Sequence, residues 1–275
     1  MHTMSGALPP SDLLGDHKAA EAALPFDPQD WDGFRALAHR MVEDMLWNLK
    51  TVRDRPVWQA VPEKVRDRLS VSVPKEGVGV EEAYEEFKRD VLPYPVGNTH
   101  PRFWGWVIGS GTPLGVMAEM LAATMNPNVS GLQGSPRYVE TQVLGWLRGM
   151  LGYPEKGVGE GSGLLVSGGS MANLVALTVA LQAKAGFDVG RLGLAQAPRR
   201  PVLYASDQTH FSIAKSVRML GLGLDALRII PVDADYRIDM DALEAAIRAD
   251  RAAGLHPFCI VGTAGTVNTG AFDPL

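Results

Sequence analysis

The feature that most constrains the fold is an alternation of short apolar runs with helical patterns in the second half of the chain. Four runs have the length of a strand: Leu164-Leu165-Val166, Val202-Leu203-Tyr204, Leu227-Arg228-Ile229-Ile230 and Phe258-Cys259-Ile260-Val261. Helical patterns at residues 170–186, 211–220 and 239–253 separate them. This order predicts an α/β fold with a mostly parallel sheet and helices on both faces. Functional residues of such sheets gather at the carboxyl ends of the strands.

A small helical layer is predicted before this sheet. From Asp30 onward, apolar residues recur at three- and four-residue steps, which indicates one long amphipathic helix. Two shorter helical patterns follow, at residues 62–69 and 80–92. The helix from Asp30 needs a partner surface, which either its own chain or a second subunit can supply.

These patterns predict three regions. We expect a flexible leader over residues 1–29, the helical layer over residues 30–95 and the first part of an α/β domain over residues 96–275. The last strand is followed only by a loop that ends at Leu275, so the sheet is expected to be incomplete. We interpret the chain as a fragment of a longer protein.

Composition narrows the class of function. With 46% hydrophobic and 21% charged residues among 275, the chain is an ordinary globular protein, and its net charge of −5 gives no basic surface for nucleic acid. The single cysteine, Cys259, excludes an intrachain disulfide and a multi-cysteine metal site, and no metal is predicted. Neither a secretion signal nor a membrane-spanning run is evident, so we expect a cytoplasmic protein without a membrane partner.

The strongest local signal is a glycine turn between a predicted strand and a predicted helix. Gly168 and Gly169 allow a ligand to approach the backbone, Ser170 offers a hydroxyl, and the start of the helix presents free N–H groups. These properties are typical of a phosphate site. The alternative is a tight turn in which Ser170 is only the helix N-cap.

Two further loops follow predicted strands. Residues 206–212 contain His210, whose imidazole could stack on a planar ring or move a proton, although a single histidine is often structural. Residues 261–274 are rich in glycine and threonine, which indicates a roomy polar pocket or simply a flexible loop. Because all three loops leave the same edge of a parallel sheet, we expect them to lie close together.

In their order and chemistry the three loops resemble those of one enzyme family. Ser-Gly-Gly-Ser-x-Ala-Asn at 167–173, Ser-Asp-x-x-His at 206–210 and Gly-Thr-x-x-x-Gly-Ala-x-Asp-Pro at 265–274 are similar to the cofactor loops of group II pyridoxal-phosphate decarboxylases. This group contains the aromatic-amino-acid and glutamate decarboxylases and belongs to the fold-type-I superfamily. The segment His100-Pro101-Arg102-Phe103-Trp104-Gly105, and Ser135-Pro136 with Glu140, resemble the family's substrate-side segment and the helix after it.

The resemblance implies roles for individual residues. Gly168, Gly169 and Ser170 would hold the phosphate of pyridoxal 5'-phosphate, and His210, as the catalytic residue, would stack on its pyridine ring. Thr266 would approach the ring substituents, although Val267 follows it where many relatives have a second hydroxyl residue.

The substrate side is implied in the same way. His100 and Trp106 would line the pocket for the amino-acid substrate. The aromatic residues near this pocket favour an aromatic amino acid as the substrate. For Trp104 and Trp106, packing in a core is the alternative.

Two residues of the family pattern are missing: the aspartate that pairs with the pyridine nitrogen and the lysine that binds the cofactor covalently. The resemblance places both beyond Leu275, so the 275-residue chain alone is expected to be inactive. Lys215 is the nearest substitute, but it lies five residues after His210 on a predicted helix.

The resemblance further implies a homodimer and decarboxylation of an L-amino acid to an amine and carbon dioxide. Two alternatives stay open: another pyridoxal-phosphate enzyme, either a carbon–carbon lyase or an aminotransferase, and a non-catalytic, dimer-forming fragment.

Overall fold

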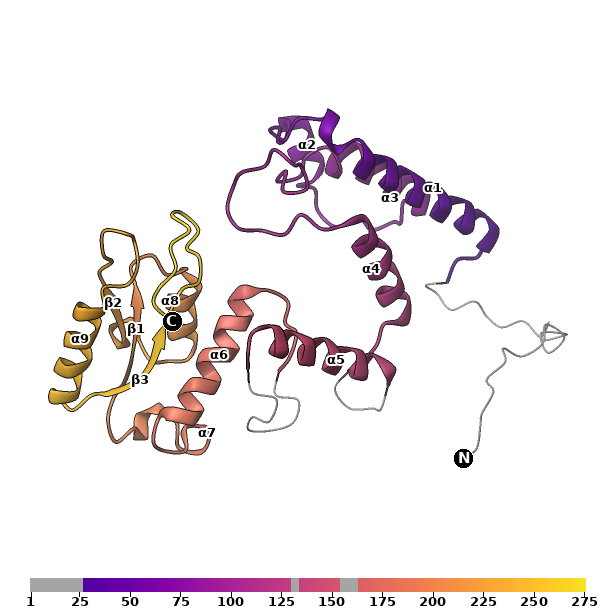
Figure 1. Cartoon of the computed structure of the whole chain (residues 1–275). Coiled ribbons are helices and arrows are strands. Elements are labelled where there is room, and N and C mark those ends of the chain that lie inside the picture. The colour runs from indigo at the N-terminus through magenta and orange to yellow at the C-terminus, as the bar shows by residue number, and fades with distance from the viewer. Residues whose placement is uncertain (1–26, 130–133, 154–162) are drawn as a thin grey trace. The chain divides into compact units, whose positions relative to one another are not determined.

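The computed structural model describes residues 27–129, 134–153 and 163–275 (Figure 1). The chain forms two compact units, of which the first ends at Met117 and the second begins at Ala118. The helices are α1 (Trp31–Lys50), α2 (Glu63–Arg68), α3 (Val80–Glu86), α4 (Pro113–Met125), α5 (Ser135–Met150), α6 (Gly169–Lys184), α7 (Val189–Leu192), α8 (Ser212–Met219) and α9 (Met240–Ala252). None of these described helices has the length and hydropathy that a membrane span requires. The predicted leader lies outside the described residues except for residues 27–29.

In the first unit, α1 begins where the sequence predicts it. The side chain of Asp30 accepts hydrogen bonds from the backbone N–H groups of Asp32 and Gly33, at 3.1 and 3.0 Å, and so caps the helix. Tyr84 on α3 donates its hydroxyl to Asp44 on α1 at 2.8 Å. Burial, together with this bond, raises the pKa of Tyr84 to about 12. The helices expected at residues 62–69 and 80–92 are also present, the latter as α3 followed by a π-helical turn over Phe87–Val91.

The second unit contains a three-stranded parallel sheet. Its strands are β1 (Pro201–Ser206), β2 (Leu227–Ile230) and β3 (His256–Val261), in the order β2-β1-β3. Three of the four predicted strands are therefore confirmed. The fourth, at residues 164–166, is wrong: Leu164 and Leu165 are 56% and 58% exposed, and the segment has no strand conformation. A strand forms only where another segment pairs with it, and none of the described segments pairs with this one.

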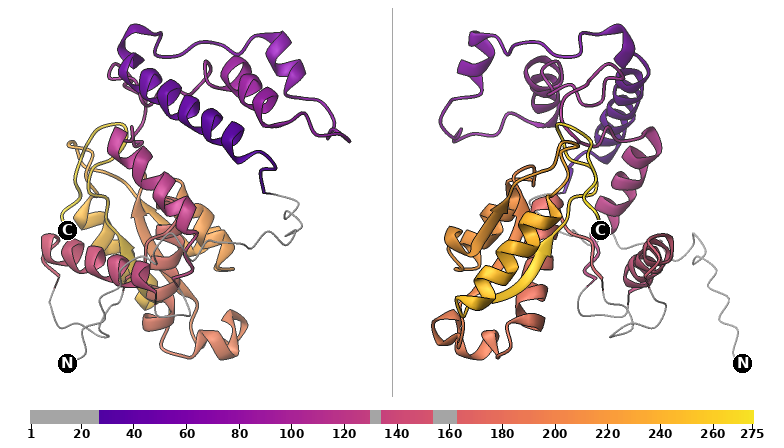
Figure 2. Two further views of the ribbon diagram at one scale, coloured as in Figure 1. Left: turned by 90° about the vertical axis from the view of Figure 1, so that its right-hand side faces the viewer. Right: turned by 60° about the vertical axis from the view of Figure 1, so that its left-hand side comes forward.

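Helices cover both faces of the sheet because β1 presents its side chains alternately to the two sides. Leu203 packs with residues of α6 and α8, whereas Val202 and Tyr204 pack with residues of α9. The route from β1 through α8 to β2 runs one way across the sheet, and the route through α9 to β3 runs back past β1. Since both crossovers of a parallel sheet are right-handed, α8 and α9 must lie on opposite faces, as Figures 1 and 2 show.

A buried cluster of polar side chains joins α9 to the sheet. Tyr204 donates its hydroxyl to Asp250 at 2.8 Å, and the guanidinium of Arg228 on β2 donates to the same carboxylate at 2.8 and 2.9 Å. The bonds from Arg228 hold the pKa of Asp250 below its usual value, and burial raises that of Tyr204. One aspartate thus ties β1, β2 and α9 together.

Candidate functional site

The carboxyl edge of the sheet contains a switch point between β1 and β3. The chain leaves β1 toward β2 on one side, whereas β3 lies on the opposite side of β1. The loops after these two strands meet there. The hydroxyl of Thr209, in the loop after β1, lies 3.3 Å from the hydroxyl of Ser206 and 3.4 Å from that of Thr263, in the loop after β3. Switch points of this kind are where parallel α/β sheets bind ligands.

The predicted glycine turn precedes α6. This helix begins at Gly169, its N-cap is Gly168, and no side chain caps it. Ser170 is therefore the second helical residue, and the interpretation of Ser170 as a plain N-cap is wrong. Among the described residues the Ser170 hydroxyl has no hydrogen-bond partner, so it and the first N–H groups of α6 are available to an anion.

Open space lies beside both glycines of this turn. A Cβ atom built on Gly168 or on Gly169 meets no other atom of the described residues within 4 Å, chain neighbours and the backbone of α6 aside. Gly168 has φ 167°, which is extended backbone, so the space beside the turn, rather than an unusual dihedral, is what glycine provides here. Uncapped N–H groups, a free hydroxyl and an unobstructed approach fit the phosphate of a cofactor.

His210 is joined to the helix that follows the glycine turn. Its Nδ1 lies 2.8 Å from the hydroxyl of Ser212, the first residue of α8, and 3.3 Å from the Ser212 backbone nitrogen. The side-chain amide of Asn173, on α6, donates to the same hydroxyl at 2.8 Å. The structure therefore brings the predicted phosphate turn and the predicted histidine together through two residues, Asn173 and Ser212, to which the sequence analysis gave no role.

Phe211 and Lys215 flank this histidine. The ring centroids of His210 and Phe211 are 4.2 Å apart and tilted by 41°. The Lys215 ammonium lies 4.3 Å from the centroid of the Phe211 ring, a cation–π contact on the exposed side of α8. Lys215, considered above as a substitute for the lysine that binds the cofactor covalently, is thus packed against the ring of Phe211.

The loop after β3 folds back on itself as a short hairpin. Ala264 and Phe272 form an antiparallel bridge, and the Thr266 hydroxyl lies 2.5 Å from that of Thr269 while accepting the N–H of Ala271 at 3.2 Å. Thr266 is buried, and its hydroxyl is used within the hairpin. Its predicted contact with the cofactor stays a prediction.

Asp273 fixes this hairpin to the rest of the unit. Its carboxylate accepts the backbone N–H of Ile238 at 2.7 Å and that of Thr263 at 2.8 Å, and the residue is only 5% exposed. The sequence signal was present, because Asp273 and Asn173 both belong to the motifs noted above. What the motif did not reveal is that Asp273 joins the hairpin to residues before α9.

The predicted substrate residues, His100 and Trp106, lie in the first unit. His100 is 4% exposed, and its Nδ1 accepts the N–H of Arg102 at 3.0 Å. Trp104 and Trp106 are 92% and 72% exposed, so neither packs in a core formed by the described residues. Trp106 has φ 52°, a left-handed conformation that is uncommon for a bulky residue and often marks a functional position.

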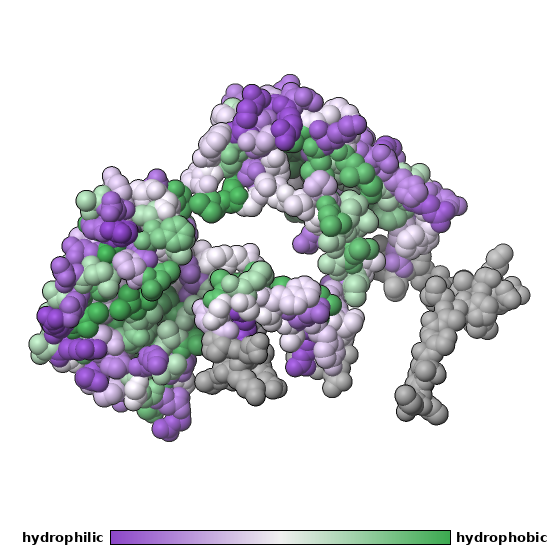
Figure 3. Space-filling view, in the orientation of Figure 1, coloured by the Kyte–Doolittle hydropathy of each residue, from purple (hydrophilic) through white to green (hydrophobic). Residues whose placement is uncertain are grey.

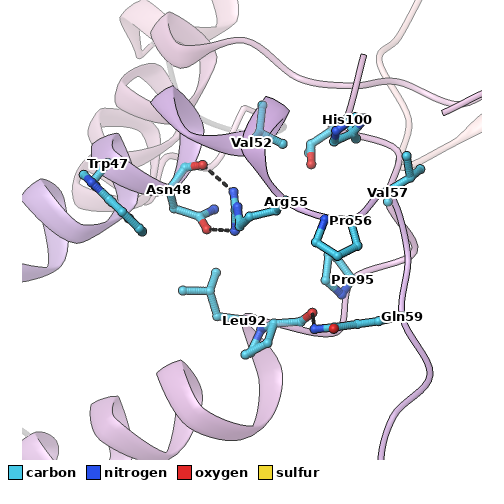
Figure 4. Close-up of a pocket in the computed structure, with 13 residues that line it drawn as sticks. Trp47, Asn48, Val52, Arg55, Pro56, Val57, Gln59, Leu92, Pro95 and His100 are labelled. Carbon is cyan, nitrogen blue, oxygen red and sulfur yellow. Dashed lines mark hydrogen bonds between the residues drawn. The ribbon is translucent and has the colours of Figure 1, made fainter. Parts of the chain in front are cut away.

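The first unit also contains a cavity that the sequence did not predict. It measures about 470 Å³, and Figure 4 shows Trp47, Leu92 and Pro95 around it with His100 at its margin. The guanidinium of Arg55 donates to the side chain and the backbone carbonyl of Asn48 there. Two buried nitrogens of its lining, Arg55 Nε and His100 Nε2, have no partner among the described residues.

Comparison with known proteins places this geometry in context. The family model described as the pyridoxal-dependent decarboxylase conserved domain matches residues 62–275. The chain is 34% identical to an aromatic-L-amino-acid decarboxylase of Bacillus atrophaeus over 88% of its length and 48% of the relative's. It is 29% identical to human cysteine sulfinic acid decarboxylase over 98% of its length and 51% of the relative's.

Solved structures give the same result. A structure of Oryza sativa TDC with PLP and tryptamine superposes with a TM-score of 0.78 at 30% identity, covering 90% of this chain and 52% of that one. The chain therefore spans about half the length of the relatives that it matches.

Proposed function

Because the chain belongs to the pyridoxal-dependent decarboxylase family, we propose that the whole protein converts an L-amino acid to an amine and carbon dioxide. Membership confirms the resemblance noted in the sequence, the fold-type-I α/β class and pyridoxal 5'-phosphate as the family's cofactor. The activity is proposed for the whole protein because the chain covers about half of its relatives.

The observation that carries the proposal is the uncapped glycine turn held beside His210 by Asn173 and Ser212. Gly168, Gly169 and Ser170 bind the phosphate through backbone N–H groups and a hydroxyl, and His210 holds the plane of the ring. When bound, pyridoxal phosphate supplies an electron-withdrawing ring that accepts the electron pair left at Cα when the carboxyl group departs. Thr266, in the hairpin after β3, would approach the ring substituents of the bound cofactor.

We further propose that His100 and Trp106 contact the amino-acid substrate in the full-length protein. An exposed indole in a left-handed backbone conformation offers a wide apolar surface, and His100 supports the start of the same segment by accepting the N–H of Arg102. Contact with this surface orients the substrate and excludes water from the reacting carbon.

We propose an aromatic L-amino acid as the substrate. The support is the chemistry of Trp104 and Trp106, whose rings favour stacking with another ring, and the presence of aromatic-L-amino-acid, tyrosine and tryptophan decarboxylases among the relatives. Cysteine sulfinic acid decarboxylases occur among the relatives too, so an acidic amino acid is the alternative to test.

The test is product analysis with the full-length protein and added pyridoxal phosphate. Aromatic and acidic L-amino acids are supplied with a ¹³C-labelled carboxyl group, and labelled carbon dioxide and the amine are measured together. We expect equal amounts of both from an aromatic substrate, and little of either from a His210→Ala variant. Formation of an oxo acid without labelled carbon dioxide would show an aminotransferase, and release of an aldehyde by carbon–carbon cleavage would show a lyase.

We also propose a homodimer. Apolar side chains remain exposed on α1, where only Leu37 is buried while Trp31, Phe34 and Met41 are exposed, and apolar surface is visible in green on the molecule in Figure 3. Sedimentation velocity of the full-length protein is the test, and a monomer at micromolar concentration would contradict the proposal. The cytoplasmic location stays a prediction.

A further inference from the structure

The side chain of Ser212, the first residue of α8, contacts the preceding loop. The N-cap of α8 is Phe211, and no side chain caps this helix. The Ser212 hydroxyl lies 2.8 Å from Nδ1 of His210. Ser212 is 1% exposed, so water does not compete for this contact.

The neighbours of Ser212 fix the direction of the bond. The backbone N–H of Ser212 donates to Nδ1 of His210 at 3.3 Å, and a backbone N–H can only donate. Nδ1 is therefore the unprotonated nitrogen of the ring, and the Ser212 hydroxyl, 2.8 Å away, donates to it as well. The side-chain amide of Asn173 donates to the Ser212 oxygen at 2.8 Å, which holds that hydroxyl in place.

We propose that Ser212 and Asn173 are positioning residues that hold His210 as the neutral tautomer with its proton on Nε2. The inference rests on the proposed function for its purpose, since a ring held in a fixed plane suits stacking against the cofactor ring. The tautomer itself follows only from the contacts within the chain, because the protonated nitrogen of a histidine is set by the bond that the other nitrogen makes.

The alternative is that these bonds only stabilise the fold. Ser216, one turn further along α8, provides the comparison: it is equally buried, and its hydroxyl donates to the Ser212 carbonyl at 2.9 Å. Its loss would remove a buried hydrogen bond of the same helix without touching His210. Ser216→Ala is therefore the matched control for Ser212→Ala.

The experiment is long-range ¹H–¹⁵N NMR of the 275-residue chain, labelled at histidine and without cofactor, at pH 8.5, where ordinary histidines are neutral. The His210 signals are identified by their loss in His210→Gln. We expect one nitrogen shift typical of a bare Nδ1 and one typical of a protonated Nε2. A single neutral hydrogen bond is worth about 1 kcal/mol, so Ser212→Ala should shift the tautomer ratio roughly fivefold toward Nδ1–H. Ser212→Thr should restore it, and Ser216→Ala should leave it unchanged.

Asn173→Asp sharpens the test by reversing the direction of the hydrogen bonds that run from residue 173 through Ser212 to His210. The introduced carboxylate accepts the Ser212 proton, which leaves the serine oxygen as an acceptor and favours Nδ1–H by more than the alanine variant does. Unchanged nitrogen shifts in both Ser212→Ala and Asn173→Asp, or an Nδ1–H tautomer in the unmodified chain, would overturn the inference. The NMR experiment needs no cofactor, so its result is independent of activity. If the 275-residue chain shows the Nε2–H tautomer but the full-length protein does not decarboxylate amino acids, the proposed function is refuted and the positioning roles of Ser212 and Asn173 stand.

Discussion

His100 in the first unit and His210 in the second make the same local hydrogen bond in different surroundings. In each, Nδ1 accepts the backbone N–H of the residue two positions further on, at 3.0 Å for Arg102 and 3.3 Å for Ser212. His210 is exposed, and its Nδ1 has a second contact with the Ser212 hydroxyl, which in turn accepts a hydrogen bond from Asn173 on α6. His100 is buried, and its Nε2 has no partner among the described residues.

The difference shows how each unit holds its candidate residues. At the sheet edge, hydrogen bonds between side chains of separate elements join the loops to one another. Around His100 the hydrogen bond is local, and the buried Nε2 finds no partner in the part of the chain that the structure describes. Variants that remove these hydrogen bonds test the contrast between the two units.

Asp273→Ala should cause the largest loss of stability. The change leaves the backbone N–H groups of Ile238 and Thr263 without acceptors in a buried place, at a cost of about 2–4 kcal/mol in the free energy of unfolding. Because all six tryptophans precede residue 163, urea unfolding is best followed by circular dichroism together with hydrogen exchange of β1. Asp235→Ala, which removes an exposed carboxylate from a nearby turn, is the control. An equal effect of the two variants would mean that the hairpin is not held by Asp273.

Tyr204→Phe should cost about 1–2 kcal/mol, because it leaves a buried Asp250 oxygen with fewer donors. The matched variant is Tyr84→Phe, which removes a bond of the same length in the first unit. Asp44 is partly exposed and can recover a bond to water, so we expect the smaller loss there. Equal losses in separate unfolding measurements would show that the first unit is cross-linked as tightly as the second.

Much of the sheet could be predicted from the sequence, because its strands and helices are encoded by local period. The runs at β1, β2 and β3 and the patterns at α6, α8 and α9 are each visible within a short window. The run at residues 164–166 has the same local signal and forms no strand. Strand formation depends on a partner elsewhere in the chain, and a local window does not contain that partner.

The site was predicted in part for the same reason. Motifs located the glycine turn and His210, and the family resemblance supplied their roles. The bond between Asn173 and Ser212 joins residues 39 positions apart, and the cavity of the first unit is lined from Trp47 to His100. Such contacts follow from packing, which period and motif do not specify.

Raising the pH should weaken the first unit through Tyr84. Its pKa is about 12 in the folded chain, against an ordinary value near 10, so between these values the folded state binds more protons than the unfolded state. The contribution to stability is therefore complete below pH 10 and falls as pH rises toward 12, by about 1 kcal/mol at pH 11. Urea unfolding followed by tryptophan fluorescence at pH 9 and pH 11 measures it. Tyr84→Phe is the control and should lack this part of the pH dependence; the same dependence in both proteins would assign it to other groups.

His100→Asn should have the smallest effect. An asparagine oxygen can accept the Arg102 N–H as Nδ1 does, and the unpaired Nε2–H disappears, which offsets the ring contacts that are lost. We expect the free energy of unfolding to change by no more than about 0.5 kcal/mol, measured by tryptophan fluorescence, which reports mainly on the first unit. A loss above about 1.5 kcal/mol would contradict this expectation and show that the His100 ring stabilises the first unit through contacts that asparagine does not replace. The same change at His210 should also leave stability nearly unaltered, because that residue is exposed, but should weaken binding of pyridoxal phosphate to the full-length protein. The two variants thus distinguish His210, whose ring is needed for cofactor binding, from His100, whose hydrogen bond to Arg102 stabilises a turn.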